Sequence, residues 1–149
     1  MDIFCKIVAG EIPSTKVWED DKFLAILDIN PNMEGLTLVI PKKHYDSDIF
    51  AMSKADVEEY MEAVKKVVTM LEKGLGVQRV SMVVEGMGVN HVHIKLYPLH
   101  GLDEKFTEMW APERVYFDKY EGYLSTRLGP QKSSEELERV AEKIRGKLS

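Results

Sequence analysis

The chain has 149 residues, of which 44% are hydrophobic and 30% charged, a composition typical of one compact soluble domain. Its formal net charge of −5 argues against bulk electrostatic binding to nucleic acid or an acidic membrane, but not against a local basic pocket for a small phosphorylated ligand. The single cysteine, Cys5, excludes an intrachain disulfide. Because there is no apolar run of about 18 residues and no signal-peptide pattern, we expect a cytoplasmic protein.

The first third of the chain predicts a short helix followed by three strands. Residues 4–9 predict a helical turn that ends at a glycine. Segments 17–19 and 23–27 are short and apolar, and the acidic turn at 20–22 between them predicts a hairpin. The almost continuous apolar run 36–40 is suited to a central strand.

A long helix follows, and its start and end are both marked by sequence signals. Ser53 predicts the N-cap, and Gly74 and Gly76 predict the end. Apolar residues recur at helical spacing between these points and predict a core-facing stripe. Residues 79–84 predict the next strand.

The C-terminal part of the chain has a different character. Residues 99–132 have no clean periodicity but are rich in aromatic side chains, so we expect this segment to pack on the domain or on a partner subunit. Ser133 with Glu136 then predicts the start of a final helix.

The segment His91-Val92-His93-Ile94-Lys95-Leu96-Tyr97-Pro98 is the most informative in the chain. It alternates polar and apolar residues, which predicts a strand. His91, His93 and Lys95 would then lie on one face, spaced by about 7 Å, while the apolar residues between them enter the core. Such a face suits phosphate chemistry, and an ordinary exposed strand face is the alternative.

Four segments, in the same order along the chain, carry a family resemblance. Residues 5–13, 24–31 and 35–44 closely resemble the opening of histidine triad (HIT) proteins, and residues 91–98 resemble their signature of three alternating histidines. The resemblance covers roughly residues 2–98. Several motifs in the correct order are far more specific than a single His-x-His pair.

The resemblance implies an α+β fold, with a HIT-like antiparallel sheet and one long helix. The chain would be a single HIT-like domain over 1–149, in which residues 99–149 form a C-terminal extension that ends in a helix. The family resemblance also implies a homodimer whose two sheets join at their strand edges.

The resemblance further implies chemistry on nucleotide conjugates such as phosphoramidates or dinucleoside polyphosphates. His93 matches the family's nucleophile, which forms a nucleotidyl-histidine intermediate that water then hydrolyses. His91 would position this nucleophile or contact the phosphate. Two alternatives stay open: a nucleotide-binding protein with little turnover, and a zinc-stabilised module that binds a protein partner.

Further residues match the family's nucleotide-binding positions. Asp28 matches the carboxylate that accepts hydrogen bonds from the ribose hydroxyls, although it could simply begin a turn. Gly88 and Asn90 could provide phosphate donors in a loop that is shorter than in many relatives, although its glycines could be needed only for the turn. Four apolar residues match or neighbour positions that form the wall of the base pocket in the family: Phe4, Ile7, Ile26 and Leu27. Each of them could equally belong to the hydrophobic core.

Two departures from the family pattern bear on the chemistry. Lys95 replaces the third histidine, and its ammonium group suits a phosphate oxygen but does not shuttle protons near pH 7 as imidazole does. Some bacterial relatives bind structural zinc through Cys-x-x-Cys and two histidines, whereas this chain has an aspartate at the first cysteine position. No cofactor is required and no metal is favoured, but zinc stays open as an alternative, with the ligand set Asp2, Cys5, His44 and His91.

Overall fold

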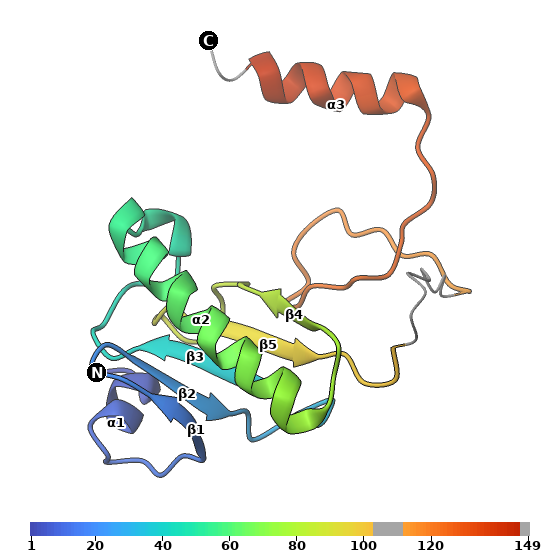
Figure 1. Cartoon of the computed structure of the whole chain (residues 1–149). Helices are drawn as coiled ribbons and strands as arrows, with labels where there is room; N and C mark the ends of the chain where they lie inside the picture. Colours follow the sequence, from blue (N-terminus) through green and yellow to red (C-terminus); the bar gives the residue numbers. More distant parts are fainter. Residues whose placement is uncertain (103–111, 147–149) are drawn as a thin grey trace. The chain divides into compact units, whose positions relative to one another are not determined.

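The computed structural model describes residues 1–102 and 112–146 (Figure 1). The chain divides into two compact units, Met1–Phe106 and Thr107–Ser149. The helices of the first unit are α1 (Ile3–Val8), the 3-10 turn η1 (Ile49–Ala51) and α2 (Lys54–Leu75). Its strands are β1 (Lys16–Glu19), β2 (Phe23–Leu27), β3 (Thr37–Pro41), β4 (Val80–Val83) and β5 (Ile94–Pro98). The second unit contains α3 (Ser134–Gly146).

The five strands form one antiparallel sheet in the order β1-β2-β3-β5-β4. The β1–β2 hairpin closes at Asp20, whose carboxylate accepts hydrogen bonds from the backbone N–H groups of Lys22 and Phe23. The strand that follows the histidines, β5, lies between β3 and β4, in the interior of the sheet. The predicted α+β architecture with an antiparallel sheet and one long helix is therefore confirmed.

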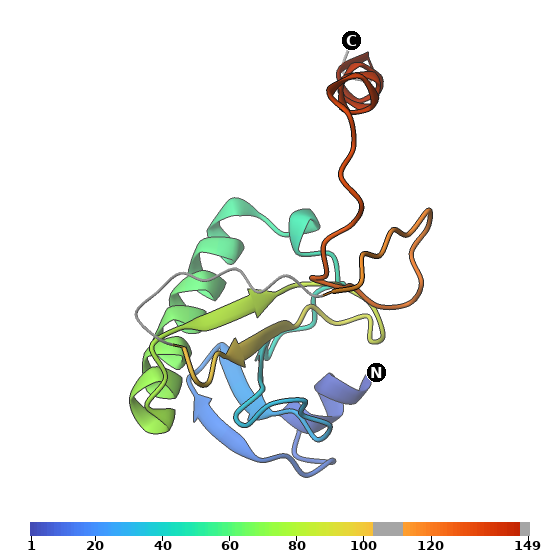
Figure 2. The same cartoon turned by 90° about the vertical axis from the view of Figure 1, so that its right-hand side faces the viewer.

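Helix α2 covers one face of the sheet (Figures 1 and 2). Ser53 caps it by accepting a hydrogen bond from the Asp56 N–H, and Gly76 ends it in the left-handed conformation at φ 66°, whereas Gly74 lies within the helix. Burial of its apolar stripe against the sheet is the main hydrophobic contribution to this unit. The buried residues of this core are Phe23, Ala25, Val39, Tyr60, Ala63, Val64, Val67, Leu71, Val92, Ile94 and Leu96.

Helix α1 packs on the opposite face of the sheet (Figure 2). Because side chains alternate along a strand, the residues between those that face α2 form a second, smaller cluster. Its buried members are Phe4, Leu24, Ile26, Leu38 and Ile40. We call the side of the sheet that bears this cluster the α1 face.

The second unit confirms the predicted final helix. The Ser133 hydroxyl accepts a hydrogen bond from the Glu136 N–H, and the Glu136 carboxylate accepts one from the Ser133 N–H, which is the reciprocal arrangement of a capping box. Part of the aromatic segment predicted to pack on the domain or a partner, including Trp110, lies outside the described residues. That packing, and the single domain with an extension from residue 99, stay predictions.

No helix in the described ranges is long and apolar enough to cross a membrane.

Removal of one buried hydroxyl tests the link between α2 and the sheet. The Tyr60 hydroxyl is fully buried and donates a hydrogen bond to the Val39 carbonyl in β3. We expect Tyr60→Phe to lower the free energy of unfolding by about 1–2 kcal/mol, because the buried Val39 carbonyl loses the hydrogen bond that the hydroxyl donates. Urea denaturation followed by circular dichroism measures this change. Tyr123→Phe is the matched control, because Tyr123 is 58% exposed; equal losses in both variants would contradict the prediction.

Candidate functional site

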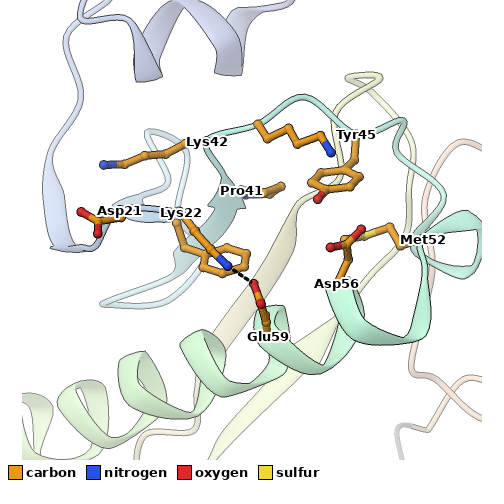
Figure 3. Close-up of a pocket in the computed structure, with 10 residues that line it drawn as sticks. Asp21, Lys22, Pro41, Lys42, Tyr45, Met52, Asp56 and Glu59 are labelled. Carbon is orange, nitrogen blue, oxygen red and sulfur yellow. Dashed lines mark hydrogen bonds and ion pairs between the residues drawn. The ribbon is translucent and has the colours of Figure 1, made fainter.

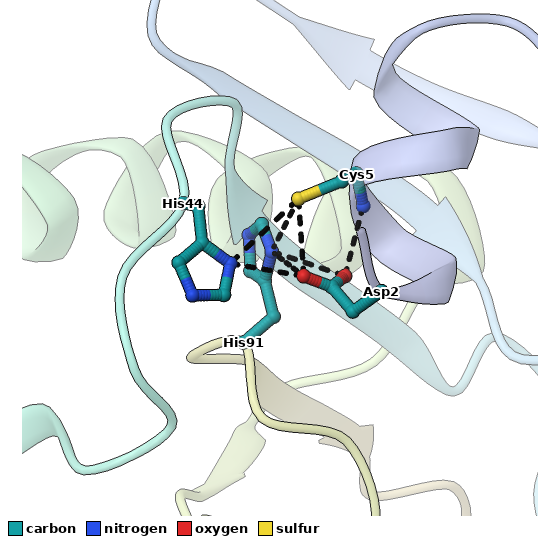
Figure 4. Close-up of side chains that lie close together, drawn as sticks. All are labelled: Asp2, Cys5, His44 and His91. Atoms are coloured by element: carbon teal, nitrogen blue, oxygen red, sulfur yellow. Dashed lines mark hydrogen bonds and ion pairs between the residues drawn. The ribbon is translucent and has the colours of Figure 1, made fainter.

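The two signature histidines lie before the strand that was predicted to contain them. Strand β5 begins at Ile94, and both histidines are buried, with His91 0% and His93 6% exposed. The predicted strand over residues 91–98 is therefore wrong at its start, because both histidines precede β5; the His91 ring turns toward α1 (Figure 4). The prediction that Val92, Ile94 and Leu96 enter the core is confirmed.

His93 is held in one orientation by the backbone. Its Nδ1 lies 2.8 Å from the carbonyl oxygen of His91. Because a carbonyl oxygen can only accept a hydrogen bond, Nδ1 carries the proton and donates it to this carbonyl. When the ring is neutral, this tautomer leaves the lone pair on Nε2. The His93 ring also packs against the ring of Phe4, with 5.3 Å between centroids. The orientation of this imidazole is thus fixed by one hydrogen bond and one aromatic contact.

Lys95 lies two residues beyond His93 and is half-buried. It pairs with Leu38 of β3, whose side chain belongs to the cluster on the α1 face. Paired residues share a face, so Lys95 lies on the α1 face, and the contact of the His93 ring with Phe4 places His93 on the same face. An imidazole ring and a lysine side chain, two residues apart in the sequence, therefore lie on the same face of the sheet.

Both ring nitrogens of His91 already have partners within the protein. Its Nε2–H donates to the carbonyl oxygen of Pro41 over 2.8 Å. Its Nδ1 lies 3.3 Å from the Asp2 carboxylate and 3.6 Å from the Cys5 sulfur. Of the two predicted roles, positioning of the nucleophile fits this placement, and contact with a phosphate does not.

Four side chains converge at the start of α1: Asp2, Cys5, His44 and His91 (Figure 4). We call them the four-residue cluster. The Asp2 carboxylate lies 3.0 Å from the Cys5 sulfur and 2.9 Å from His44 Nδ1, and the Cys5 sulfur lies 3.7 Å from His44 Nδ1. One donor atom from each residue lies within 4.8 Å of all the others.

The charges within the cluster are strongly coupled. Burial alone would raise the pKa of Asp2, but hydrogen bonds from Cys5 and the attraction of His91 hold this pKa well below its ordinary value of 3.8. The hydrogen bond from the Cys5 thiol to Asp2, followed by burial, raises the pKa of that thiol. These contacts therefore favour the charged form of Asp2 and the protonated form of Cys5.

The donor set and its spacing fit a tetrahedral metal ion. Zinc bonds of about 2.0–2.3 Å to oxygen, nitrogen and sulfur place neighbouring ligand atoms roughly 3.3–3.7 Å apart, close to the separations in the cluster. Each histidine also directs its Nε2 to an oxygen acceptor, His91 to the Pro41 carbonyl and His44 to Asp46 at 3.5 Å. Such outer partners are typical of histidines that ligate metals. These residues could hold zinc.

The predicted ribose-binding residue, Asp28, follows β2 directly and is half-buried. Its backbone N–H donates to the Leu36 carbonyl, and its carboxylate accepts from the Asn30 N–H at 2.7 Å, so it does begin a turn. Contact with ribose stays a prediction, because one carboxylate can make both sets of hydrogen bonds.

The predicted base-pocket residues divide between the two faces of the sheet. Phe4 and Ile26 are buried in the cluster on the α1 face, and Ile7 packs against it. Leu27 follows Ile26 on the same strand, so its side chain points to the opposite face. Contact of Leu27 with the base stays a prediction, and the structure does not place Leu27 in the same apolar cluster as Ile26.

The loop before His91 is shaped by its glycines and anchored by Asn90. Gly86 and Gly88 have φ values of 76° and 88°, which favour glycine, so the turn itself requires them. The Asn90 amide accepts from the Ser47 N–H at 3.0 Å and donates to Asp46 at 3.1 Å. A phosphate contact by Gly88 or Asn90 stays a prediction.

Sequence reasoning missed Asp46 and the carbonyl of Pro41, which support the two cluster histidines. Asp46 lies two residues after His44, which is a usable local signal for an outer partner. The Pro41 carbonyl is a backbone group 50 residues from His91 in the sequence, so no sequence pattern identifies it.

A cavity of about 310 Å³ lies elsewhere, beside the first turns of α2 (Figure 3). Its lysines already have partners: Lys22 pairs with Glu59 at 2.7 Å, Lys42 pairs with Glu19 at 2.8 Å, and Lys43 lies over the ring of Tyr45. Its lining also contains no histidine or cysteine. The histidine segment is therefore the stronger candidate site.

Known proteins resemble this chain over most of its length. The family profile described as the HIT domain matches residues 9–101. An uncharacterised HIT-like protein of Methanocaldococcus jannaschii is 40% identical over 124 residues, 80% of this chain and 95% of that protein. An adenosine 5′-monophosphoramidase of Candida albicans is 32% identical over 147 residues, 93% of this chain and 92% of that protein. A crystal structure from Streptococcus mutans, 29% identical, covers 99% of this chain and 85% of that one with a TM-score of 0.67. The chain belongs to the HIT domain family.

Proposed function

We propose that this protein is a nucleotide hydrolase or transferase of the HIT type. It cleaves a nucleoside-phosphate conjugate, a phosphoramidate or a dinucleoside polyphosphate, through a nucleotidyl-histidine intermediate on His93. The observation that carries the proposal is the fixed orientation of His93, whose Nδ1–H is bound to the His91 carbonyl while Nε2 keeps the lone pair. The Candida albicans relative, named as an adenosine 5′-monophosphoramidase, supports the class of substrate.

The chemistry runs in two displacements at phosphorus. His93 Nε2 attacks the α-phosphorus, the bond from phosphorus to the leaving group breaks, and the leaving group departs with the bonding electrons and takes up a proton. Water then attacks the same phosphorus, the bond from phosphorus to Nε2 breaks, and the nucleotide leaves with the ring restored. Two moderate barriers replace one high barrier.

Lys95 supplies positive charge to this reaction. Negative charge spreads over the phosphoryl oxygens in the transition state, and a fixed cation on the same face as the nucleophile stabilises it. Because the Lys95 ammonium is a permanent charge, it acts by electrostatic attraction and leaves proton transfer to water or to the leaving group.

The remaining contacts follow the family resemblance. Asp28 accepts hydrogen bonds from the ribose hydroxyls, and Phe4, Ile7 and Ile26 form the apolar wall for the base on the α1 face. The loop that contains Gly88 and Asn90 lies on the phosphate side. The functional form is a cytoplasmic homodimer that joins at its sheet edges and does not bind nucleic acid in bulk.

We also propose that zinc occupies the four-residue cluster. The Nε2–H of His91 donates to the Pro41 carbonyl. When the ring is neutral, Nδ1 therefore has no proton and directs its lone pair toward the Asp2 carboxylate, 3.3 Å away. Two facing acceptors need a proton or a cation between them. A zinc ion bound to all four residues would supply a structural crosslink between the start of α1, the residues after β3 and the residues before β5.

The covalent intermediate gives the most direct test of the enzyme. Incubation with adenosine 5′-phosphoramidate, an acid quench and intact-mass measurement are expected to show a nucleotidyl adduct on the wild type and none on His93→Ala. His100→Ala is the control, because the exposed His100 ring interacts with the Glu34 carbonyl. Nucleotide binding by calorimetry with neither adduct nor product over hours would favour the alternative of a binding protein with little turnover.

The charge on Lys95 is tested by size-matched replacements. We expect Lys95→Met to lower kcat by about 10²-fold, the usual effect of removing one group that stabilises transition-state charge. Lys95→Arg keeps the charge and should retain most of the activity. Steady-state kinetics of both variants measure the effect, and an unchanged kcat for Lys95→Met would remove Lys95 from the mechanism.

Metal content tests the cluster directly. Protein purified without chelator or histidine tag is expected to contain about one zinc per chain by elemental mass spectrometry, and Cys5→Ala is expected to lose it. Strong chelation should lower the Tm of the wild type by about 5 °C or more, because the ion binds only the folded form. Zinc binding would be contradicted if the wild type contained much less than one zinc per chain and its Tm did not change when chelator was added.

A further inference from the structure

The geometry points to a second role for the four-residue cluster: with zinc bound, it holds the nucleophile His93 in its reactive orientation. Zinc would then be a positioning element for catalysis and not only a stabiliser of the fold. This inference rests on the proposed function of His93. Three structural links between the cluster and His93 support it.

The first link passes through a single residue, His91. Its ring belongs to the cluster and is anchored on the other side by the Pro41 carbonyl. Its backbone carbonyl accepts the Nδ1–H of His93. Because the His91 side chain is 0% exposed and bound at both nitrogens, fixing the ring also fixes the peptide unit that orients His93.

The second link passes through α1. Asp2 and Cys5 flank Phe4, whose ring lies 5.3 Å from His93 and 5.8 Å from His91. A helix of six residues has little stability of its own, so its position depends on anchoring contacts. A metal held by Asp2 and Cys5 would supply that anchor and keep the Phe4 ring against the nucleophile.

The third link passes through residues 41–47, which contain His44. The Val92 N–H donates to the Tyr45 carbonyl at 3.1 Å, and Asn90 bonds both the Ser47 N–H and the Asp46 carboxylate. Residues on both sides of His91 are therefore hydrogen-bonded to the segment that carries His44. A metal bound by both His44 and His91 would join residues 41–47 to the residues around His91 through one further link.

These links predict an effect on the rate more than on substrate binding. A displacement of about 1 Å in a reacting group can cost on the order of 10²-fold in rate. The cluster itself offers nothing to the substrate, since the rings of His44 and His91 are directed at Asp2 and Cys5. Loss of the metal should therefore lower kcat and leave KM almost unchanged.

His44→Ala is the best variant, because His44 is half-exposed and has no hydrogen bond to His93 or to the face that carries it. His44→Cys restores a zinc ligand at the same position and is the rescue variant. Lys43→Ala is the matched control: it changes the neighbouring residue, whose side chain lies over Tyr45. Chelation of the wild type, followed by addition of zinc chloride, provides a second route that requires no mutation.

Each protein is examined by zinc content, by kcat and KM with adenosine 5′-phosphoramidate, and by ¹⁵N NMR of the histidine rings at fixed pH. We expect His44→Ala and the chelated wild type to lose zinc, to lose tenfold or more in kcat with KM within about twofold, and to show a mixture of His93 tautomers. The zinc-loaded wild type, Lys43→Ala and His44→Cys should show one tautomer with the proton on Nδ1.

Two results would overturn the inference. One is a wild type that binds no zinc. The other is loss of zinc that leaves both kcat and the His93 ring signals unchanged, which would restrict the metal to stabilising the fold. If the wild type has neither turnover nor adduct, the proposed function fails, while the tautomer measurement still decides whether the cluster orients His93.

Discussion

The hydrogen bond from His93 Nδ1–H to the carbonyl of His91 is the constraint on which the proposed chemistry depends. An imidazole ring has two nitrogens that compete for one proton, and a freely rotating ring would offer either of them to a substrate. A backbone carbonyl removes this ambiguity, since it accepts only from an N–H. The carbonyl belongs to the residue before Val92, whose side chain is buried in the core beneath α2. The hydrophobic core therefore anchors the chain next to the carbonyl that orients His93.

The two faces of the sheet differ in what they carry: one bears the larger hydrophobic core, and the other bears the candidate site. The face under α2 carries the larger core, in which Tyr60 is buried and bonded to β3. The α1 face has a smaller apolar cluster and also carries His93 and Lys95. This division would allow a protein with net charge −5 to bind the proposed nucleotide ligand. Local cations and oriented donors determine the potential at such a site, and the total charge has little influence there.

Short-range rules account for what the sequence predicted well. Ser53 and the pair Ser133 and Glu136 were identified as helix starts because capping depends on residues three apart. The strand at residues 23–27 was predicted because an apolar run next to an acidic turn has few other stable conformations.

Long-range contacts account for the errors. Alternation at His91 to Lys95 predicts a strand but not where its ladder begins, because that depends on the partner strand. The members of the four-residue cluster were named from the family resemblance, and their convergence required the fold. The Pro41 carbonyl that receives the His91 proton had no signature in the sequence.

Asp2 has two duties that cannot be adjusted independently. One carboxylate oxygen caps α1 through the Cys5 N–H, and the other faces the sulfur and the two imidazoles. A cysteine at this position would add a softer ligand but would be a poorer helix cap, whereas serine or asparagine would keep the cap and give up the charged ligand. The affinity for the proposed metal and the stability of α1 would thus both depend on this one residue. An engineer who wishes to tune this site has to begin by giving α1 another cap.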